Sequence, residues 1–105
     1  MIAKPLTVGL RAIHPGEVLR EDVLPALGRS KSEIARLLGV SRQTLYDLLG
    51  EKQPITATMA LRIGKLCGNG GGIWYAMQQA YDLRVAEAMI ADEIAAIPTL
   101  HIAGE

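Results

Sequence analysis

Four residues that can form hydrogen bonds with the edges of nucleic-acid bases lie close together in the chain: Arg42, Gln43, Thr44 and Tyr46. A guanidinium group can bond two acceptors of guanine, and a carboxamide can pair with both the donor and the acceptor of adenine. Each such two-bond pair discriminates against the wrong base by about 1–3 kcal/mol. Thr44 and Tyr46 can reach a thymine methyl group or a phosphate. These four are candidate base-reading residues if one element presents them together.

Lys31, Ser41 and Lys52 lie around this group and are candidates for contacts with phosphate. Positive charges, hydroxyl groups and the N–H groups at helix starts all suit phosphate oxygens. Asp47 is unfavourable beside phosphate, so we expect it either to accept a hydrogen bond from cytosine or to pair with Arg42. The alternative for the whole set is an ordinary solvated surface.

Two short helices joined by a glycine turn are predicted to position these side chains. The first (Ser30 to Leu38) opens with Ser30 and Glu33 at the spacing of a capping box. Gly39 then favours the positive φ that ends a helix. The second (Ser41 to Leu49) has Ser41 as a favourable N-cap. With the small residue Ala35 where the helices cross, this pattern predicts a helix-turn-helix, whose second helix enters the major groove by its N-terminal end.

Three further helices complete a predicted all-α bundle of five. One follows the sequence His14-Pro15-Gly16-Glu17, is interrupted by Pro25 and ends at Gly28. The others are expected from about Thr56 to Gly68 and, as one long C-terminal helix, from about Ile73 to Ala96. Proline suits the first position of a helix, and glycine suits its end.

The segments outside this bundle have weak patterns. We expect a domain at residues 14–97 that includes the C-terminal helix, an extended arm at residues 1–13 and a tail at residues 98–105. Apolar residues alternate at Leu6, Val8 and Leu10, and a short apolar run follows at Leu100 to Ile102. The two could pair as a small ribbon, although two isolated strands are marginal.

No grouping of residues in the sequence supports catalysis, so we expect no enzyme activity and no cofactor. His14 and Glu17 could form a metal or acid–base pair, but no second His or Cys lies near them in the sequence. We therefore interpret them as helix-capping residues. The single cysteine, Cys67, cannot form an intrachain disulfide and is interpreted as a small buried residue.

The net charge of zero conceals two halves of opposite sign. Residues 29–72 hold seven basic and three acidic residues, a net charge of +4, whereas residues 73–105 hold one basic and five acidic residues, a net charge of −4. The middle of the chain is thus the part suited to phosphate. No stretch approaches the roughly 18 apolar residues of a membrane span. The lone cysteine and the lack of a signal-like apolar run favour the cytoplasm.

With these residues in view, the chain resembles the HigA family of addiction-module antidotes, which are antitoxins built on an Xre-type helix-turn-helix. The resemblance runs from about His14 to Leu83. Its matching pieces include Leu38-Gly39-Val40-Ser41-Arg42-Gln43-Thr44-Leu45, and the two that are most specific to this branch are His14-Pro15-Gly16-Glu17 and Met59-Ala60-Leu61-Arg62. It implies a lambda-repressor-like fold. Two departures are Gly50-Glu51, where the family usually has Asn-Gly, and Asn69 to Gly72, where many members have Thr-Ser-Pro and where a looser hinge is expected.

The resemblance implies that the protein binds and neutralises a HigB-like toxin, an mRNA-cleaving ribonuclease of the RelE type. It also implies repression of its own operon by a homodimer on palindromic double-stranded operator DNA, with half-sites about 34 Å apart. Trp74, Tyr81 and Val85 are candidate dimer anchors, or else ordinary core residues. The acidic stretch from Asp82 to Glu93 would complement a basic nuclease. The alternative function is a stand-alone Xre-type transcriptional regulator with no toxin partner.

Overall fold

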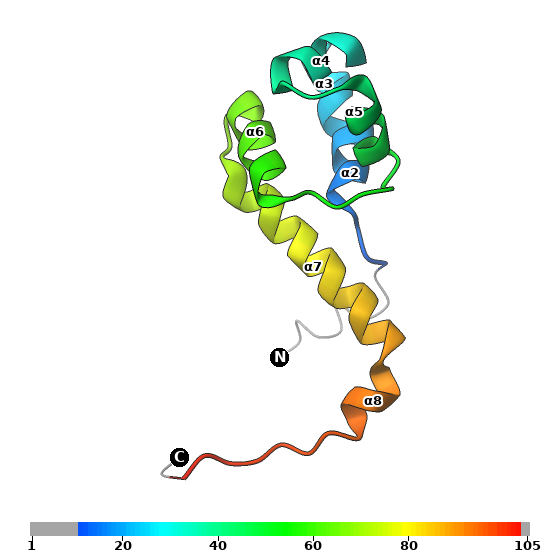
Figure 1. The fold of residues 1–105 in the computed structure, drawn as a ribbon, viewed down its shortest axis with the longest axis vertical. Helices are drawn as coiled ribbons and strands as arrows, with labels where there is room; N and C mark the ends of the chain where they lie inside the picture. Colours follow the sequence, from blue (N-terminus) through cyan, green and yellow to red (C-terminus); the bar gives the residue numbers. More distant parts are fainter. Residues whose placement is uncertain (1–10, 104–105) are drawn as a thin grey trace.

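The computed structural model describes residues 11–103 of the chain. Every regular element in this range is helical: α2 (Pro15–Val18), η1 (Leu19–Val23), α3 (Leu24–Leu27), α4 (Lys31–Leu38), α5 (Arg42–Leu49), α6 (Ala57–Cys67), α7 (Gly71–Met89) and α8 (Ala91–Ala95). The fold is therefore all-α and contains the predicted helix-turn-helix as α4 and α5 (Figure 1). Among the same residues, none of the helices is long and apolar enough to cross a membrane.

The first helix continues through the proline that was expected to interrupt it. Its segments α2, η1 and α3 follow one another without a gap, because the middle segment is a π-turn in which Leu24 N–H bonds the carbonyl of Leu19. An α-helical turn would place the ring of Pro25 against a carbonyl of the preceding turn, and the wider π-turn relieves that crowding. The helix ends at Gly28, where φ is +67°.

The turn between α4 and α5 forms as the residue types predict. Gly39 has a φ of +76°, its N–H bonds the carbonyl of Arg36, and Val40 N–H bonds the carbonyl of Ala35. These two bonds make a Schellman motif, which satisfies the last carbonyls of α4. Arg62 Nη1 from α6 donates to the neighbouring carbonyl of Leu38 at 2.8 Å, and so ties α6 to this turn.

The core lies between the helix-turn-helix and the helices on either side of it. It consists of Leu19, Leu24, Ile34, Ala35, Leu38, Leu45, Leu48, Leu49, Ile55, Ala60, Ile63 and Trp74. Leu45, Leu48 and Leu49 of α5 and the small residue Ala35 of α4 are all in this set. Sequence patterning did not single out Ile55, which stands alone in a loop, yet only 1% of its surface is exposed. The buried Gln78 Oε1 accepts its backbone N–H at 2.8 Å, and so fixes the loop against α7.

The turn between α6 and α7 is tight, in contrast to the loose hinge expected there. A Cβ on Gly64 would overlap the backbone of Gly70 and Gly71, so the two helices cross with backbone in contact. Asn69 Oδ1 accepts a hydrogen bond of 3.0 Å from the indole of Trp74. Glycine at these positions allows the two helices to approach closely and does not loosen the turn between them.

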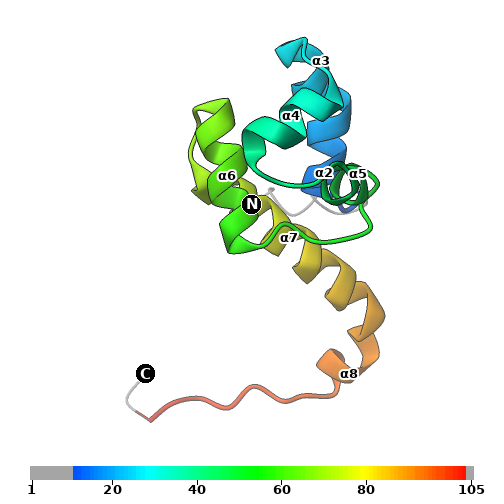
Figure 2. The same cartoon turned by 45° about the horizontal axis from the view of Figure 1, so that its top comes forward.

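The C-terminal helix is broken rather than continuous to Ala96. The backbone of Ile90, with φ −121° and ψ 30°, leaves the helical region and separates α7 from α8. All residues from 85 to 103 are exposed, so no packing holds this part straight. Figures 1 and 2 both show α7 leaving the bundle, with α8 and the tail extending beyond it. The radius of gyration of 17.5 Å exceeds the roughly 13 Å of a compact chain of this length.

The tail from residue 98 to residue 103 contains no strand, and so Leu100 to Ile102 do not form one. The other half of the predicted ribbon, Leu6 to Leu10, lies outside the described residues.

Candidate nucleic-acid interface

The N-terminal end of α5 is capped by Ser41. Ser41 Oγ accepts a hydrogen bond of 3.0 Å from Thr44 N–H and donates one of 2.9 Å to Thr44 Oγ1. The hydroxyl of Ser41 is therefore already engaged, and Thr44 is half-buried beside it. The N–H groups of Arg42 and Gln43, in the first turn, have no partner within the helix and project with the positive end of its dipole.

Three of the four candidate base-reading side chains are exposed on α5: Arg42, Gln43 and Tyr46. Arg42 Nη1 donates to Ser32 Oγ at 3.4 Å, a long bond to the start of α4. Of the Tyr46 surface, 47% is exposed, and Lys31 Nζ lies 5.9 Å from its ring centre. A cation at this distance over an aromatic face is attracted by the ring. The structure thus brings one phosphate candidate, Lys31, against the side chain of Tyr46 on α5.

Asp47 does not pair with Arg42, one of the two partners considered for it from the sequence. Its Oδ1 accepts a hydrogen bond of 2.8 Å from Gln43 Nε2, one helical turn earlier. The predicted pairing with Arg42 is therefore wrong. The spacing of four residues places both side chains on the same side of α5. Lys52 is exposed in the loop after α5, and its backbone N–H bonds the carbonyl of Asp47 at 2.8 Å.

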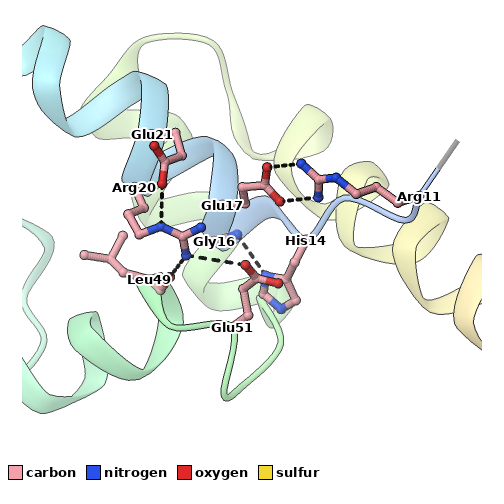
Figure 3. Close-up of polar contacts among 8 residues, drawn as sticks. All are labelled: Arg11, His14, Gly16, Glu17, Arg20, Glu21, Leu49 and Glu51. Carbon is pink, nitrogen blue, oxygen red and sulfur yellow. Dashed lines mark hydrogen bonds and ion pairs between the residues drawn. The ribbon is translucent and has the colours of Figure 1, made fainter.

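The other end of α5 is fixed by Arg20, which the sequence analysis did not single out. Arg20 Nη1 donates to the carbonyl of Leu49 at 2.6 Å and lies 3.4 Å from Glu51 Oε2, while its Nε pairs with Glu21 at 2.9 Å (Figure 3). Hydrogen bonding to Glu21 raises the pKa of Arg20. The first helix therefore holds the C-terminal end of α5 through one guanidinium group.

Glu51 adopts a left-handed backbone conformation, with a φ of +61°. It is one of the two positions where the chain departs from the expected Asn-Gly pair. Non-glycine residues are uncommon in this region, and Asn is among the best tolerated. The Glu51 carboxylate lies 3.4 Å from Arg20 Nη1, a contact that the sequence alone does not reveal.

His14 caps the first helix, as interpreted from the sequence. Its Nδ1 accepts a hydrogen bond of 2.8 Å from Gly16 N–H, only 3% of the residue is exposed, and its ring edge packs on Tyr81 at 4.9 Å between centroids. Burial lowers the pKa of His14. Glu17 bonds Arg11 instead, at 2.7 and 2.5 Å, and this hydrogen bonding lowers the pKa of Glu17 (Figure 3). Residues 11–103 contain no group of three potential metal ligands.

The three candidate dimer anchors lie in different environments. Trp74 is a core residue of the protomer, with 2% of its surface exposed, which leaves almost none of it for a partner. Tyr81 is half-buried against His14, and Val85 is 36% exposed. Tyr81 also lines an open groove of about 390 Å³ together with Arg11, Ala12, Ile13, Met77, Ala80 and Arg84.

Comparison with known proteins identifies the family. No family model matches the chain. Virulence-associated protein I of Dichelobacter nodosus is 43% identical over 76 residues, which cover 72% of this chain and 70% of that protein. Antitoxin HigA-1 of Vibrio cholerae serotype O1 is 30% identical over 73 residues, which cover 70% of this chain and 69% of that protein. The chain belongs to the HigA antitoxin family.

A solved structure supports the same assignment across the whole domain. The Pseudomonas aeruginosa antitoxin HigA, solved with the higBA promoter, is 36% identical and superimposes with a TM-score of 0.81. The match covers 87% of this chain and 100% of that one. The family resemblance read from His14 to Leu83 is confirmed, and so is the HigA-type helix-turn-helix fold.

Proposed function

We propose that this HigA family member is a cytoplasmic antitoxin and autorepressor. As a homodimer it binds palindromic operator DNA through α5, and it neutralises a HigB-like, mRNA-cleaving toxin of the RelE type by binding it. The observation that carries the DNA half is the capped and exposed N-terminal end of α5, which presents Arg42 and Gln43. The relative from Pseudomonas aeruginosa, which shares this fold, was solved with its promoter.

The proposed DNA contacts follow from the side chains at that end of the helix. Arg42 and Gln43 read base edges in the major groove, and Tyr46 and Thr44 contact a thymine methyl group or a phosphate. Thr44 Oγ1 accepts from Ser41 and so keeps its own proton to donate. Phosphates are bound by Lys31 and Lys52, and near Ser41 by the N–H groups at the start of α5.

The DNA contacts are tested by operator binding at physiological salt. At the protein concentration that just shifts all the DNA for the wild type, Arg42→Ala and Gln43→Ala should each abolish the gel shift on the upstream DNA of the operon, without changing the circular dichroism spectrum. Gln79→Ala, an exposed glutamine on α7, is the matched control and should bind as the wild type does. Lys52→Ala should weaken binding equally on all sequences and reduce the salt slope by about 1. Unchanged shifts for both α5 variants would contradict the proposed function.

The proposed dimer is formed by the C-terminal part of the chain, where every residue from 85 to 103 is exposed. The domain of residues 14–97 ends in helices whose apolar side chains are exposed: Leu83 by 64%, Met89 by 75% and Ile94 by 52%. An isologous pair of α7 helices would cover Val85 and Met89 and would bring Tyr81 and its groove to the edge of the interface. Residues 1–13 and 98–105 flank this domain as arm and tail.

Light scattering tests the dimer. The wild type should have twice the 11.3 kDa mass of the chain, whereas Met89→Asp should give a monomer. Because half-sites are read in pairs, the monomer should also lose operator binding. Ala88→Asp, at an exposed site one residue away, adds the same charge on another side of α7 and is the control. A monomeric wild type that still binds a full operator would contradict the dimer.

The proposed toxin contact lies on the acidic C-terminal part of the chain. Asp82, Glu87, Asp92 and Glu93 are all exposed on α7 and α8, and a basic nuclease would be attracted to them. The test is co-expression with the small basic protein encoded next to this gene. Co-purification and loss of toxicity are expected. If the neighbouring protein neither binds nor is toxic, the chain is a stand-alone regulator.

A further inference from the structure

Asp47 is the one acidic residue of the DNA-facing helix α5, residues 42–49. A negative charge on this helix repels phosphate whatever the DNA sequence. The structure nevertheless places its carboxylate in a short hydrogen bond, 2.8 Å from Gln43 Nε2. Asp47 is half-buried, whereas Gln43 is exposed at the N-terminal end of the helix. The bond therefore links the exposed side chain of Gln43, which donates, to the half-buried side chain of Asp47, which accepts.

We propose that Asp47 is a positioning residue that sets the base preference of Gln43 to adenine. The inference rests on the proposed binding of DNA through α5. A carboxamide has two N–H donors and one carbonyl acceptor, whereas a carboxylate can only accept. With one N–H bonded to Asp47, Gln43 keeps one N–H and its oxygen, which are the donor and the acceptor that adenine requires. If the Gln43 amide were turned by 180°, its oxygen would face the carboxylate oxygen of Asp47, and the two acceptors would repel each other.

Asp47 should therefore have opposite effects on affinity and on specificity. Its charge lowers the affinity for every DNA sequence by the same factor, because phosphate repulsion does not depend on the bases. Its hydrogen bond raises the preference for one base at one position. A residue with a merely structural role would change both quantities in the same direction when it is replaced.

Two substitutions of Asp47 separate the charge from the hydrogen bond. Asp47→Asn removes the charge but keeps an oxygen that can accept from Gln43 Nε2. Asp47→Ala removes both, and it favours the helix because alanine has the highest helix propensity. Asp47→Ala should therefore remain folded, and its circular dichroism spectrum checks this.

The experiment measures binding of the full-length protein to four duplexes that differ at one base pair. A selection from random duplexes first defines the preferred site, and the base pair is the one whose preference Gln43→Ala removes. The wild type should prefer adenine there by about 5- to 150-fold. Asp47→Ala should reduce that preference by roughly two- to tenfold, the range that one hydrogen bond is worth. Both Asp47 variants should bind nonspecific DNA more tightly, and Asp47→Asn, whose amide can accept from Gln43 but can also donate to it, should lower the preference by less than Asp47→Ala does.

A double substitution tests whether Asp47 acts through Gln43. In the Gln43→Ala background, Asp47→Ala should change no base preference, because the residue it orients is gone. If Gln43→Ala changes the base preference at one position and Asp47→Ala changes it at none, the inference is wrong while the proposed function stands. If Asp47→Ala changes the preference equally with and without Gln43, the inference is wrong as well. A wild type that selects no DNA sequence overturns the proposed function and this inference with it.

Discussion

The buried cap of the first helix predicts a specific loss of stability at acid pH. Only the neutral ring of His14 can accept from Gly16 N–H through Nδ1, at 2.8 Å, because both nitrogens of a charged imidazole are donors. Burial lowers the pKa of His14 in the folded state more than Glu51, the Gln53 backbone and Asp82 raise it. The unfolded chain therefore takes up this proton at a higher pH than the folded chain does. Stability due to His14 is complete above pH 6.5 and declines as the pH falls through the lower pKa of the folded state.

The magnitude follows from the cap itself. A lost N-cap costs about 0.5–2 kcal/mol, and a loss of 1 kcal/mol lowers the melting temperature of a domain of this size by about 4 °C. His14→Asn keeps a capping side chain but removes the titration, since asparagine is among the best N-caps. Between pH 7.5 and pH 5, the melting temperature of the wild type should then fall by several degrees more than that of His14→Asn. This expectation does not depend on how far the two melting temperatures differ at pH 7.5.

Thermal unfolding followed by circular dichroism at several pH values measures this difference. All other titrating groups are shared by the two proteins, so the difference between their pH profiles isolates His14. Parallel profiles for wild type and His14→Asn would refute the argument, because they would show that the His14 proton is bound equally in both states.

Four more substitutions test the backbone contacts between the helices, with Gly72→Ala as the comparison for Gly16→Ala. Gly16→Ala should cost about 1–3 kcal/mol, because its Cβ would overlap the Leu48 carbonyl; Gly72→Ala, with open space around it, should add about 0.5–1 kcal/mol in the same urea titration. Arg20→Met should cost about 1–3 kcal/mol of unfolding free energy and weaken operator binding in gel shifts, since it leaves the Leu49 carbonyl without its charged donor. Arg62→Ala, which frees the Leu38 carbonyl, should cost about 1 kcal/mol with operator binding retained.

Local signals in the sequence were sufficient for the helix-turn-helix. Ser30, Gly39 and Ser41 each act within four residues of themselves, by accepting a backbone N–H or by adopting a positive φ. Such short-range effects can be read one residue at a time. The placement of all four candidate base-reading residues on α5 followed directly from these boundaries.

Contacts between distant segments were not visible in the sequence. Arg20 reaches the end of α5 across 29 residues, and Gln78 holds Ile55 across 23 residues. Neither side chain belongs to a local pattern that reveals its partner. The break at Ile90 was missed for a related reason: the helical period continues through it, and only the absence of packing around residues 85–103 leaves the helix unsupported. Periodicity shows where a helix can form, whereas tertiary contacts decide how far it extends.

The two acidic residues near the DNA-facing helix illustrate how formal charge misleads. Counted along the sequence, Asp47 and Glu51 weaken the case for a phosphate-binding surface. In the structure, each carboxylate has a partner on or beside α5. Asp47 accepts a hydrogen bond from Gln43, and Glu51 lies beside Arg20, which holds the end of the helix. The Glu51 charge is thus partly balanced by a guanidinium that also holds the Leu49 carbonyl. Residues 11–103 contain no ion pair to Asp47, and selectivity at one base pair would explain its presence on a helix that, as proposed, approaches phosphate.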